Sequence, residues 1–245
     1  SLSVDAVYAE DIIQGGTVYG LDGIYFSPET IEPGKGYWVR ATEDGEITLS
    51  SEASAKQGSF VNRMDEANSI SFSTDGYSTS LYFGIEVPDE ELLSYSLPPL
   101  FTQISFDVRF SGDMKYVPDN GEIEVLNTSE TLTIEYDIKI EAGEHLNWVL
   151  RDINGESFVL DGSGEINVPN DEKFSLGREP AIPVNYTLHQ NYPNPFNPVT
   201  TIRYDLPAQA FVRVTIFDML GRQVTRLVQK EQEPGFKSVR WDATD

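Results

Sequence analysis

Residues 131–140 read Thr-Leu-Thr-Ile-Glu-Tyr-Asp-Ile-Lys-Ile, so every even position is apolar and every odd position is polar. Side chains of a β-strand point alternately to the two faces of a sheet, and this pattern predicts a strand with one buried and one solvated face. The same alternation recurs in residues 105–110, 122–125 and 211–217. No long segment follows the helical period, and the sequence therefore predicts an all-β protein.

Turn residues separate these runs. Asn154-Gly155 lies between the apolar runs 148–150 and 158–160 and predicts a β-hairpin with a type I′ turn, because both residue types tolerate positive φ angles. Pro33-Gly34 fits a type II turn, in which proline fixes φ at the first central position and glycine takes a positive φ at the second. Short strands at regular spacing between such turns predict antiparallel β-sandwiches.

The composition permits a folded core and excludes several kinds of chemistry. Hydrophobic residues make up 39% of the 245 positions and aromatic residues 11%. The chain has no cysteine, which excludes disulfides, thiolate metal sites and cysteine nucleophiles. No stretch approaches the roughly 20 apolar residues of a membrane helix, so we expect no membrane insertion. The first residues form no basic and apolar leader, and we expect a mature or excised piece of an exported protein.

The charge is large, negative and unevenly placed. Forty acidic side chains against 17 basic ones give a net charge of -23, so we expect no nucleic-acid partner and no anionic membrane surface. Such acidity favours solubility in an extracellular medium. Residues 179–245 hold seven basic and seven acidic side chains, and residues 1–178 therefore carry the whole net charge.

These patterns predict antiparallel β-sandwich modules in tandem. Residues 1–66 form a small β-rich module, and residues 67–178 form an antiparallel sandwich. A linker at residues 179–190 contains two prolines, which disfavour strand pairing. Residues 191–245 form the last domain.

The last domain opens on a motif of alternating asparagines and prolines. Its residues are Asn191, Tyr192, Pro193, Asn194, Pro195, Phe196, Asn197 and Pro198. The three prolines fix φ and forbid a helix, and the three asparagines can bond their own backbone in Asx turns. We expect Tyr192 and Phe196 to be the apolar anchors of this stiff segment, and a strand to follow at residues 201–206.

This motif and the residues after it resemble a known family. Residues 214–224 read Val-Thr-Ile-Phe-Asp-Met-Leu-Gly-Arg-Gln-Val, and residues 239–242 read Val-Arg-Trp-Asp. Together they resemble the type A C-terminal sorting domain of the type IX secretion system, which is similar in fold to the Ig-like domain of the flagellar hook-capping protein. The resemblance adds Gly221, as the residue with the special dihedral of a hairpin turn, and Trp241 to the sorting motif.

The resemblance implies a destination. Members of this family cross the outer membrane through the type IX translocon, which reads the domain, and are released or anchored at the cell surface. Their activities range from proteases and glycosidases to adhesins, so the domain does not define an activity. Family members continue beyond the Trp-Asp motif with further strands. We therefore expect the last domain to lack its closing strands and to offer an open sheet edge for self-association.

The first module contains a second resemblance. Its Pro-Gly-Lys-Gly-Tyr-Trp segment, residues 33–38, resembles one found upstream of such sorting domains in large exported proteins. Tyr25 and Trp38 are candidates for an aromatic platform that stacks on a sugar ring, and packing into the core is the alternative use of these rings.

Calcium is the metal that the acidic turns suit best. Asp152 and Asn154 in one turn, and Asp161 in the next, cluster oxygen ligands of the kind that hard cations prefer. None of these turns matches a complete calcium-binding loop, and the same residue types are common in ordinary turns. We expect no other cofactor.

The sequence points away from catalysis. His145 and His189 are the whole supply of histidine, and neither has a second histidine at the spacing of a zinc motif. No Gly-x-Ser-x-Gly segment occurs. We therefore expect no catalytic residues and a non-catalytic C-terminal region of a secreted or cell-surface bacterial protein. The alternatives are a subunit of an extracellular filament or surface layer completed by β-strand addition, and a carbohydrate-binding accessory module.

Overall fold

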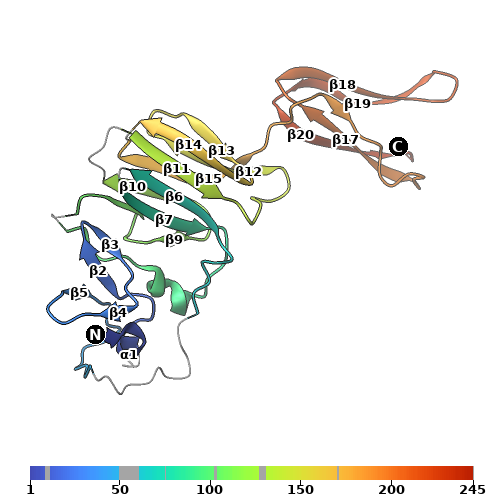
Figure 1. Cartoon of the computed structure of the whole chain (residues 1–245). Helices are drawn as coiled ribbons and strands as arrows, with labels where there is room; N and C mark the ends of the chain where they lie inside the picture. The colour runs from blue at the N-terminus through green and yellow to red at the C-terminus, as the bar shows by residue number, and fades with distance from the viewer. Residues whose placement is uncertain are drawn as a thin grey trace. The chain divides into compact units, whose positions relative to one another are not determined.

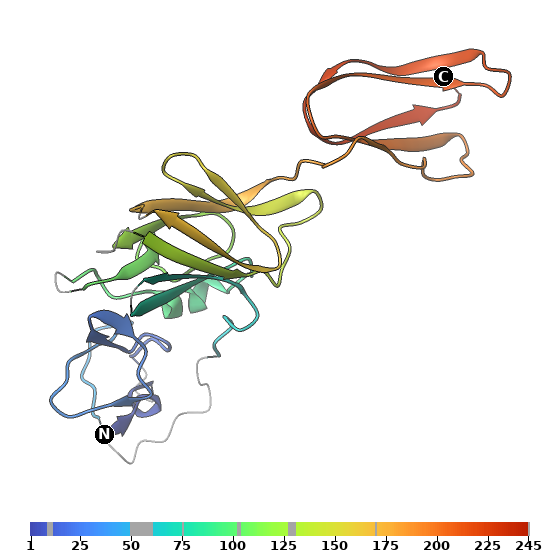
Figure 2. The same ribbon diagram turned by 45° about the horizontal axis from the view of Figure 1, so that its top comes forward.

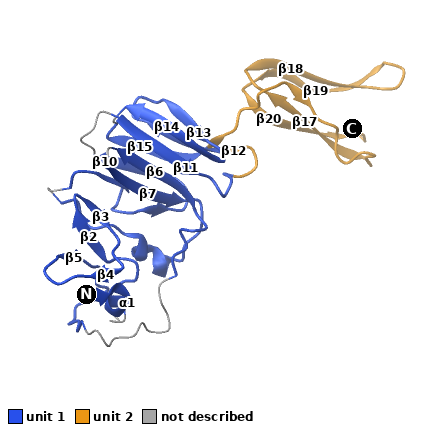
Figure 3. Ribbon diagram, in the orientation of Figure 1, with its two compact units in different colours: residues 1–142, 147–178 blue, residues 143–146, 179–245 orange. Residues whose placement is uncertain are grey.

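The computed structural model describes residues 1–8, 12–49, 61–74, 76–101, 104–126, 131–169 and 171–244. Strands make up 50% of the structure and helices 5%, and the sheets are mostly antiparallel, which confirms the predicted all-β fold. The chain forms two compact units (Figure 3). Unit 1 comprises residues 1–142 and 147–178, and unit 2 comprises residues 143–146 and 179–245.

Unit 1 is built around two five-stranded sheets that lie face to face (Figure 1). The first sheet, in the order β13-β12-β15-β10-β8, consists of Ser157–Leu160, Leu146–Asp152, Lys173–Pro180, Gly121–Leu126 and Asp107–Phe110. The second sheet, in the order β14-β11-β6-β7-β9, consists of Ser163–Pro169, Thr131–Asp137, Asn68–Thr74, Tyr77–Phe83 and Tyr116–Val117. β9 pairs with β7 in the parallel sense, at the edge of its sheet.

The space between the two sheets is filled by apolar side chains. Leu132 and Ile134 of β11 are fully buried there, as the alternation of residues 131–140 predicts. They meet Ile123 of β10 and Phe174 of β15 from the facing sheet. Each such side chain contributes about 1.5–3 kcal/mol by leaving water, so this sandwich core is the main source of stability in unit 1.

β11 ends at Asp137, three residues before the alternating sequence does. The reason is Asn68, a fully buried residue at the start of β6. Its Oδ1 accepts hydrogen bonds from the amides of Lys139, at 2.8 Å, and Ile140, at 2.7 Å, and its Nδ2 donates to the Ile140 carbonyl at 3.0 Å. The Nε1 of Trp148 donates to the same carbonyl at 2.9 Å. The backbone amides of Lys139 and Ile140 are therefore bonded to the Asn68 side chain and not to the backbone of a neighbouring strand, which ends β11.

β8 departs from the predicted alternation because its polar residues are also buried. Arg109 Nε lies 2.6 Å from Asp107 Oδ1, and Arg109 Nη2 lies 2.8 Å from Asp107 Oδ2. Arg109 Nη1 donates to the Pro98 carbonyl at 2.8 Å and to Asp113 Oδ1 at 2.6 Å. A bidentate ion pair with further hydrogen bonds to the guanidinium can lie in a buried position where a lone charge cannot.

Two predicted turns are present, one of them with a different geometry. At Pro33-Gly34 the amide of Lys35 donates to the carbonyl of Glu32 and Gly34 has a φ of 83°, as a type II turn requires. β12 and β13 form the predicted hairpin. Its loop holds four residues, 153–156, and of the Asn154-Gly155 pair only Gly155, at 89°, has a positive φ, so the turn is not type I′.

The N-terminal part of unit 1 is a set of short strands around one helix. β1 (Leu2–Ser3) pairs with β4 (Thr30–Ile31), helix α1 spans Val4–Tyr8, and β3 (Ile24–Phe26), β2 (Tyr19–Asp22) and β5 (Tyr37–Trp38) form a three-stranded sheet. Its small core consists of Val4, Val7, Ile13 and Val18.

This N-terminal part packs on the end of the 3-10 helix η1 (Asp89–Tyr95) and on the residues after it. Gln14 Nε2 donates to Ser94 Oγ at 2.7 Å, the Tyr19 hydroxyl to the Ser96 carbonyl at 3.1 Å, and the Tyr25 hydroxyl to the Pro99 carbonyl at 3.0 Å. We call residues 94–99 the seat. Arg109 also binds the seat, through the hydrogen bond from its Nη1 to the Pro98 carbonyl.

Unit 2 contains a three-stranded sheet and a long hairpin. The sheet, in the order β16-β17-β20, consists of Thr187–Leu188, Val199–Leu206 and Gly235–Asp242, and the hairpin pairs β18 (Ala210–Phe217) with β19 (Gln223–Gln232). The buried side chains are few, chiefly Ile202, Tyr204 and Leu206 of β17 and Val228 of β19. Val212, Val214 and Ile216, the apolar positions of the predicted alternation, are only half-buried. Among the residues that the structure describes, no helix is long and apolar enough to cross a membrane.

Candidate functional site: one end of unit 2

The asparagine–proline motif is fixed to the start of β17 by a buried hydroxyl. Asn191 Nδ2 donates to Thr200 Oγ1 at 3.0 Å, and Thr200 Oγ1 donates to the Pro193 carbonyl at 3.0 Å. Thr200 is 2% exposed. The peptide bonds Tyr192–Pro193 and Asn194–Pro195 are cis. The side chains of Asn191 and Thr200 thus hold a segment whose prolines have no backbone N–H to donate to a neighbouring strand. Thr200 is a member of the site that the sequence analysis does not identify.

Of the two predicted anchors of this motif, only Phe196 packs. Its ring lies 5.2 Å from the ring of Trp241 in β20, centre to centre, which joins the motif to the other end of the matched sequence. Tyr192 exchanges two backbone hydrogen bonds with Thr201, but its side chain is 77% exposed. The prediction that Tyr192 is an apolar anchor is wrong, because the backbone bridge with Thr201 turns its ring outward.

Pro198 and the exposed asparagines complete the motif. The Pro198 carbonyl accepts from the amide of Ala243, directly after β20. Asn194, Pro195 and Asn197 are exposed at the surface of the segment. The motif therefore closes one end of the β17–β20 pair.

The β18–β19 hairpin ends in a tightly bonded turn. Asp218 Oδ1 accepts from the amides of Leu220 and Arg222, both at 2.9 Å, and Asp218 Oδ2 lies 2.7 Å from Arg222 Nε. Gly221 has a φ of 76°, the left-handed value that the sequence predicts for it. These bonds hold the pKa of the Asp218 carboxyl below its ordinary value, first through the Arg222 amide and then through the Arg222 side chain.

The hairpin tip and the asparagine–proline motif lie at the same end of unit 2, and the hairpin extends beyond β17 and β20 (Figures 1 and 2). The structure therefore brings together both parts of the predicted sorting motif, residues 191–198 with Trp241 and the turn of Gly221, at one end of one unit.

Both histidines lie in unit 2, and each has a partner nearby. His189 Nε2 lies 2.7 Å from Asp205 Oδ2, an arrangement that orients a histidine, but among the described residues no hydroxyl is hydrogen-bonded to this ring. His145 stacks on Phe236 with 3.9 Å between ring centres. The His189–Asp205 pair is not visible in the sequence, because β16 and β17 bring together residues 16 apart.

The predicted sugar platform is part of a packed aromatic cluster. Tyr19 lies between the two candidates, 6.4 Å from Tyr25 and 6.1 Å from Trp38, centre to centre. The Tyr25 hydroxyl is bonded to the seat, and the guanidinium of Arg40 lies over Trp38 at 5.7 Å. Both rings remain partly exposed, so carbohydrate binding stays a prediction.

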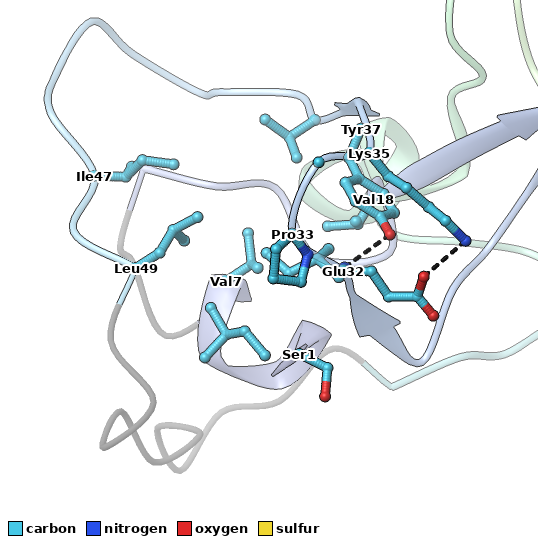
Figure 4. Close-up of a pocket in the computed structure, with 13 residues that line it drawn as sticks. Ser1, Val7, Val18, Glu32, Pro33, Lys35, Tyr37, Ile47 and Leu49 are labelled. Atoms are coloured by element: carbon cyan, nitrogen blue, oxygen red, sulfur yellow. Dashed lines mark hydrogen bonds and ion pairs between the residues drawn. The ribbon is translucent and has the colours of Figure 1, made fainter.

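A pocket of about 610 Å³ lies in the N-terminal part of unit 1 (Figure 4). Its walls are apolar, with Val7 and Val18 on one side and Ile47 and Leu49 on another. The ionisable side chains in the lining include Glu32 and Lys35, which bind each other at 2.7 Å. Tyr25 and Trp38 do not line this pocket, so it is separate from the predicted sugar platform.

The acidic turns lie apart from one another in sequence and are bonded locally. Asp152 Oδ1 accepts from the Glu156 amide across the loop that holds Asn154, and Asp161 lies in the β13–β14 turn. Burial, and then the charge of Asp152, raises the pKa of Asp171, a neighbour that the sequence does not reveal. The described residues contain no group of three or more His, Cys, Asp or Glu side chains that could hold a metal ion. Calcium binding stays a prediction.

Lys115 is a half-buried cation that the sequence analysis missed. Its Nζ lies 5.7 Å from the ring centre of Tyr19 and 5.8 Å from that of Tyr95. Burial lowers its pKa to about 8. The sequence carries no signal of this environment, because it depends on Tyr19 and Tyr95 from distant segments.

Comparison with known proteins identifies the class of the second unit. Residues 190–237 match the family model of the secretion system C-terminal sorting domain. No curated protein and no solved structure matches the chain. The match covers the whole 191–198 motif and Gly221, and Trp241 lies beyond it.

The chain therefore carries a type IX sorting domain. Such a domain interacts with the secretion machinery, and the protein is exported across the outer membrane to a secreted or cell-surface location. The type A subtype, the Ig-like character of the domain and the resemblance of residues 33–38 stay predictions.

Proposed function

We propose that this chain is a non-catalytic region of an exported surface protein, in which unit 2 is the export address and unit 1 is a structural module. The observation that carries the proposal is the match at residues 190–237, together with the position of its motif residues at one end of unit 2.

The packing of unit 1 supports a structural role. Its sandwich core is apolar throughout, and its most buried ionic group, Arg109, is bonded to Asp107, Asp113 and Pro98. Arginine keeps its proton at neutral pH, so this ion-paired guanidinium is a poor general acid or base. The outward acids of the alternating strands serve solubility.

The test of the export role is a deletion in the parent protein. Without residues 187–245 the parent should accumulate in the periplasm, whereas the intact protein should reach the medium or the cell surface. Cell fractionation and immunoblotting measure the two pools. Normal export of the shortened protein would refute the proposal, and substrate turnover by the purified chain would refute its non-catalytic part.

Self-association through sheet edges is the second candidate, because β20 is an eight-residue strand at the edge of its sheet. An exposed strand of that length presents unpaired backbone groups that a second copy can pair with. Gel filtration with light scattering over a range of concentrations tests it. A monomer at all concentrations would remove this candidate.

A further inference from the structure

The tip of the β18–β19 hairpin exposes apolar side chains to a degree unusual for a folded unit. Met219 is 103% exposed and Leu220 is 78% exposed. Phe217 and Val224, at the strand ends beside them, are 59% and 54% exposed. We call these four residues the tip cluster. Contiguous exposed apolar side chains mark contact surfaces, whereas single ones do not.

The tip cluster is presented by a rigid support. The carboxylate of Asp218 binds two amides and one guanidinium of the same turn, and Asp218 and Arg222 also form a backbone bond. A preorganised turn loses little conformational entropy when it binds, so Met219 and Leu220 suit insertion into a pocket of a partner.

Basic side chains outnumber acidic ones around the tip. Residues 210–229 contain Arg213, Arg222 and Arg226 against the single acid Asp218, which pairs with Arg222, whereas residues 179–245 as a whole are neutral. A basic rim around an apolar centre is complementary to an apolar pocket bordered by acidic side chains.

We infer that the tip cluster is the surface by which the sorting domain engages the secretion machinery, and that the engaged protein offers an apolar pocket with an acidic rim. This inference rests on the proposed export function. It assigns the contact to Met219 and Leu220, with Arg226 steering the encounter.

The experiment compares export of the full-length parent and four variants in the organism that makes it. The double variant Met219→Ser/Leu220→Ser removes the apolar centre and should lower export by roughly tenfold or more, the weakening typical of losing a central contact residue. Phe211→Ser is the matched control, since Phe211 is 57% exposed on the same hairpin at its other end. Arg226→Glu should slow export, and Lys230→Glu, further along β19, should not.

The outcomes separate the two proposals. If deletion of residues 187–245 leaves export normal, the proposed function itself fails. If the deletion blocks export and the double serine variant is exported like the parent, only the tip inference fails. Equal loss in the double variant and Phe211→Ser would also overturn it, since the effect would then be general.

Two measurements on the purified chain complete the test. Thermal unfolding of the double serine variant should match that of the parent chain, because fully exposed side chains contribute little to stability. A double variant that unfolds at markedly lower temperature would show the cluster to be structural and overturn the inference. A parent chain that dimerises through the tip, with a monomeric double variant, would assign the cluster to a second copy and overturn it as well.

Discussion

Arg109 illustrates how a single side chain can contradict a good sequence pattern. Residues 105–110 alternate apolar and polar, and the pattern predicts that Asp107 and Arg109 face water. Both are buried, because Arg109 satisfies both oxygens of Asp107 and reaches the seat. The alternation of apolar and polar residues predicts which face of the sheet each side chain is on. It does not predict that Asp107 and Arg109 form an ion pair that allows their face to be buried.

This pair leads to a prediction of stability. Arg109→Leu should destabilise unit 1 by about 3–5 kcal/mol, because it leaves the Asp107 carboxylate buried without a partner. Urea unfolding followed by tryptophan fluorescence measures the loss. Lys35→Met is the control, since the solvent-exposed Glu32–Lys35 pair should contribute little to stability. Equal effects of the two changes would contradict the argument.

A substitution at Gly221 tests the energetic cost of a backbone conformation without any change in side-chain packing. No atom lies within 4 Å of the position that a Cβ would occupy, and φ is 76°. Gly221→Ala should therefore destabilise unit 2 by about 1–2 kcal/mol from the left-handed conformation alone. Calorimetry of the full chain measures it. Gly36→Ala, which also meets open space but has no positive φ, should change stability little.

Among the elements, β11 shows what sequence can and cannot predict. Its type, its buried face and its start follow from period two, and the core residues Leu132 and Ile134 are where the pattern places them. Its end does not follow, because the partner of Lys139 and Ile140 is a side chain some 72 residues earlier. Propensity and periodicity are local, whereas this termination is a long-range hydrogen bond.

Asn68 provides the corresponding test. Asn68→Ala should destabilise unit 1 by about 2–4 kcal/mol, because the amides of Lys139 and Ile140 lose their acceptor. Urea unfolding measures it, and hydrogen exchange should accelerate at the amides of Lys139 and Ile140. Ser71→Ala is a suitable control, since among the described residues its hydroxyl bonds that of Ser80 across the β6–β7 ladder and no backbone amide. Unchanged exchange at both amides would count against this role of Asn68.

The candidate site could be predicted only in part, because some of its residues carry local sequence signals and others depend on long-range contacts. The asparagine–proline motif and Gly221 carry strong local signals, because proline and glycine restrict or extend φ whatever surrounds them. Thr200 and the exposed Tyr192 carry none, since their roles depend on the bridge between residues 192 and 201. The tip cluster reads in sequence as ordinary strand and turn, and its exposure appears only when the hairpin is seen to extend past its neighbours.

At the level of the whole molecule, the buried ionisable groups of unit 1 set a dependence on pH. Burial lowers the pKa of Lys115 to about 8 and raises that of Tyr116 to about 12, and it raises the pKa of Tyr19 further. Above about pH 8 the unfolded chain binds more protons at Lys115 than the native chain, so stability rises with pH up to about 10. Beyond that the native tyrosines keep protons that the unfolded chain loses, and stability falls.

Lys115→Met should abolish the rise between about pH 8 and about pH 10 and keep the fall above it, because only the lysine is removed. Urea midpoints at one-unit steps of pH measure the curve. Lys35→Met, at an exposed site, should retain the rise. A variant without Lys115 that still gains stability over this interval would show that another group is responsible.

The seat also determines how unit 1 would respond to a nick in its chain. Three hydrogen bonds from Gln14, Tyr19 and Tyr25 end on residues 94–99, and Arg109 ties the same segment to β8. A protease site engineered between residues 49 and 61 should therefore yield two fragments that co-elute in gel filtration under native conditions and separate only in denaturant. The two fragments would form a non-covalent complex. The peptide connection between them would help unit 1 to fold, but it would not be needed to hold the folded fragments together.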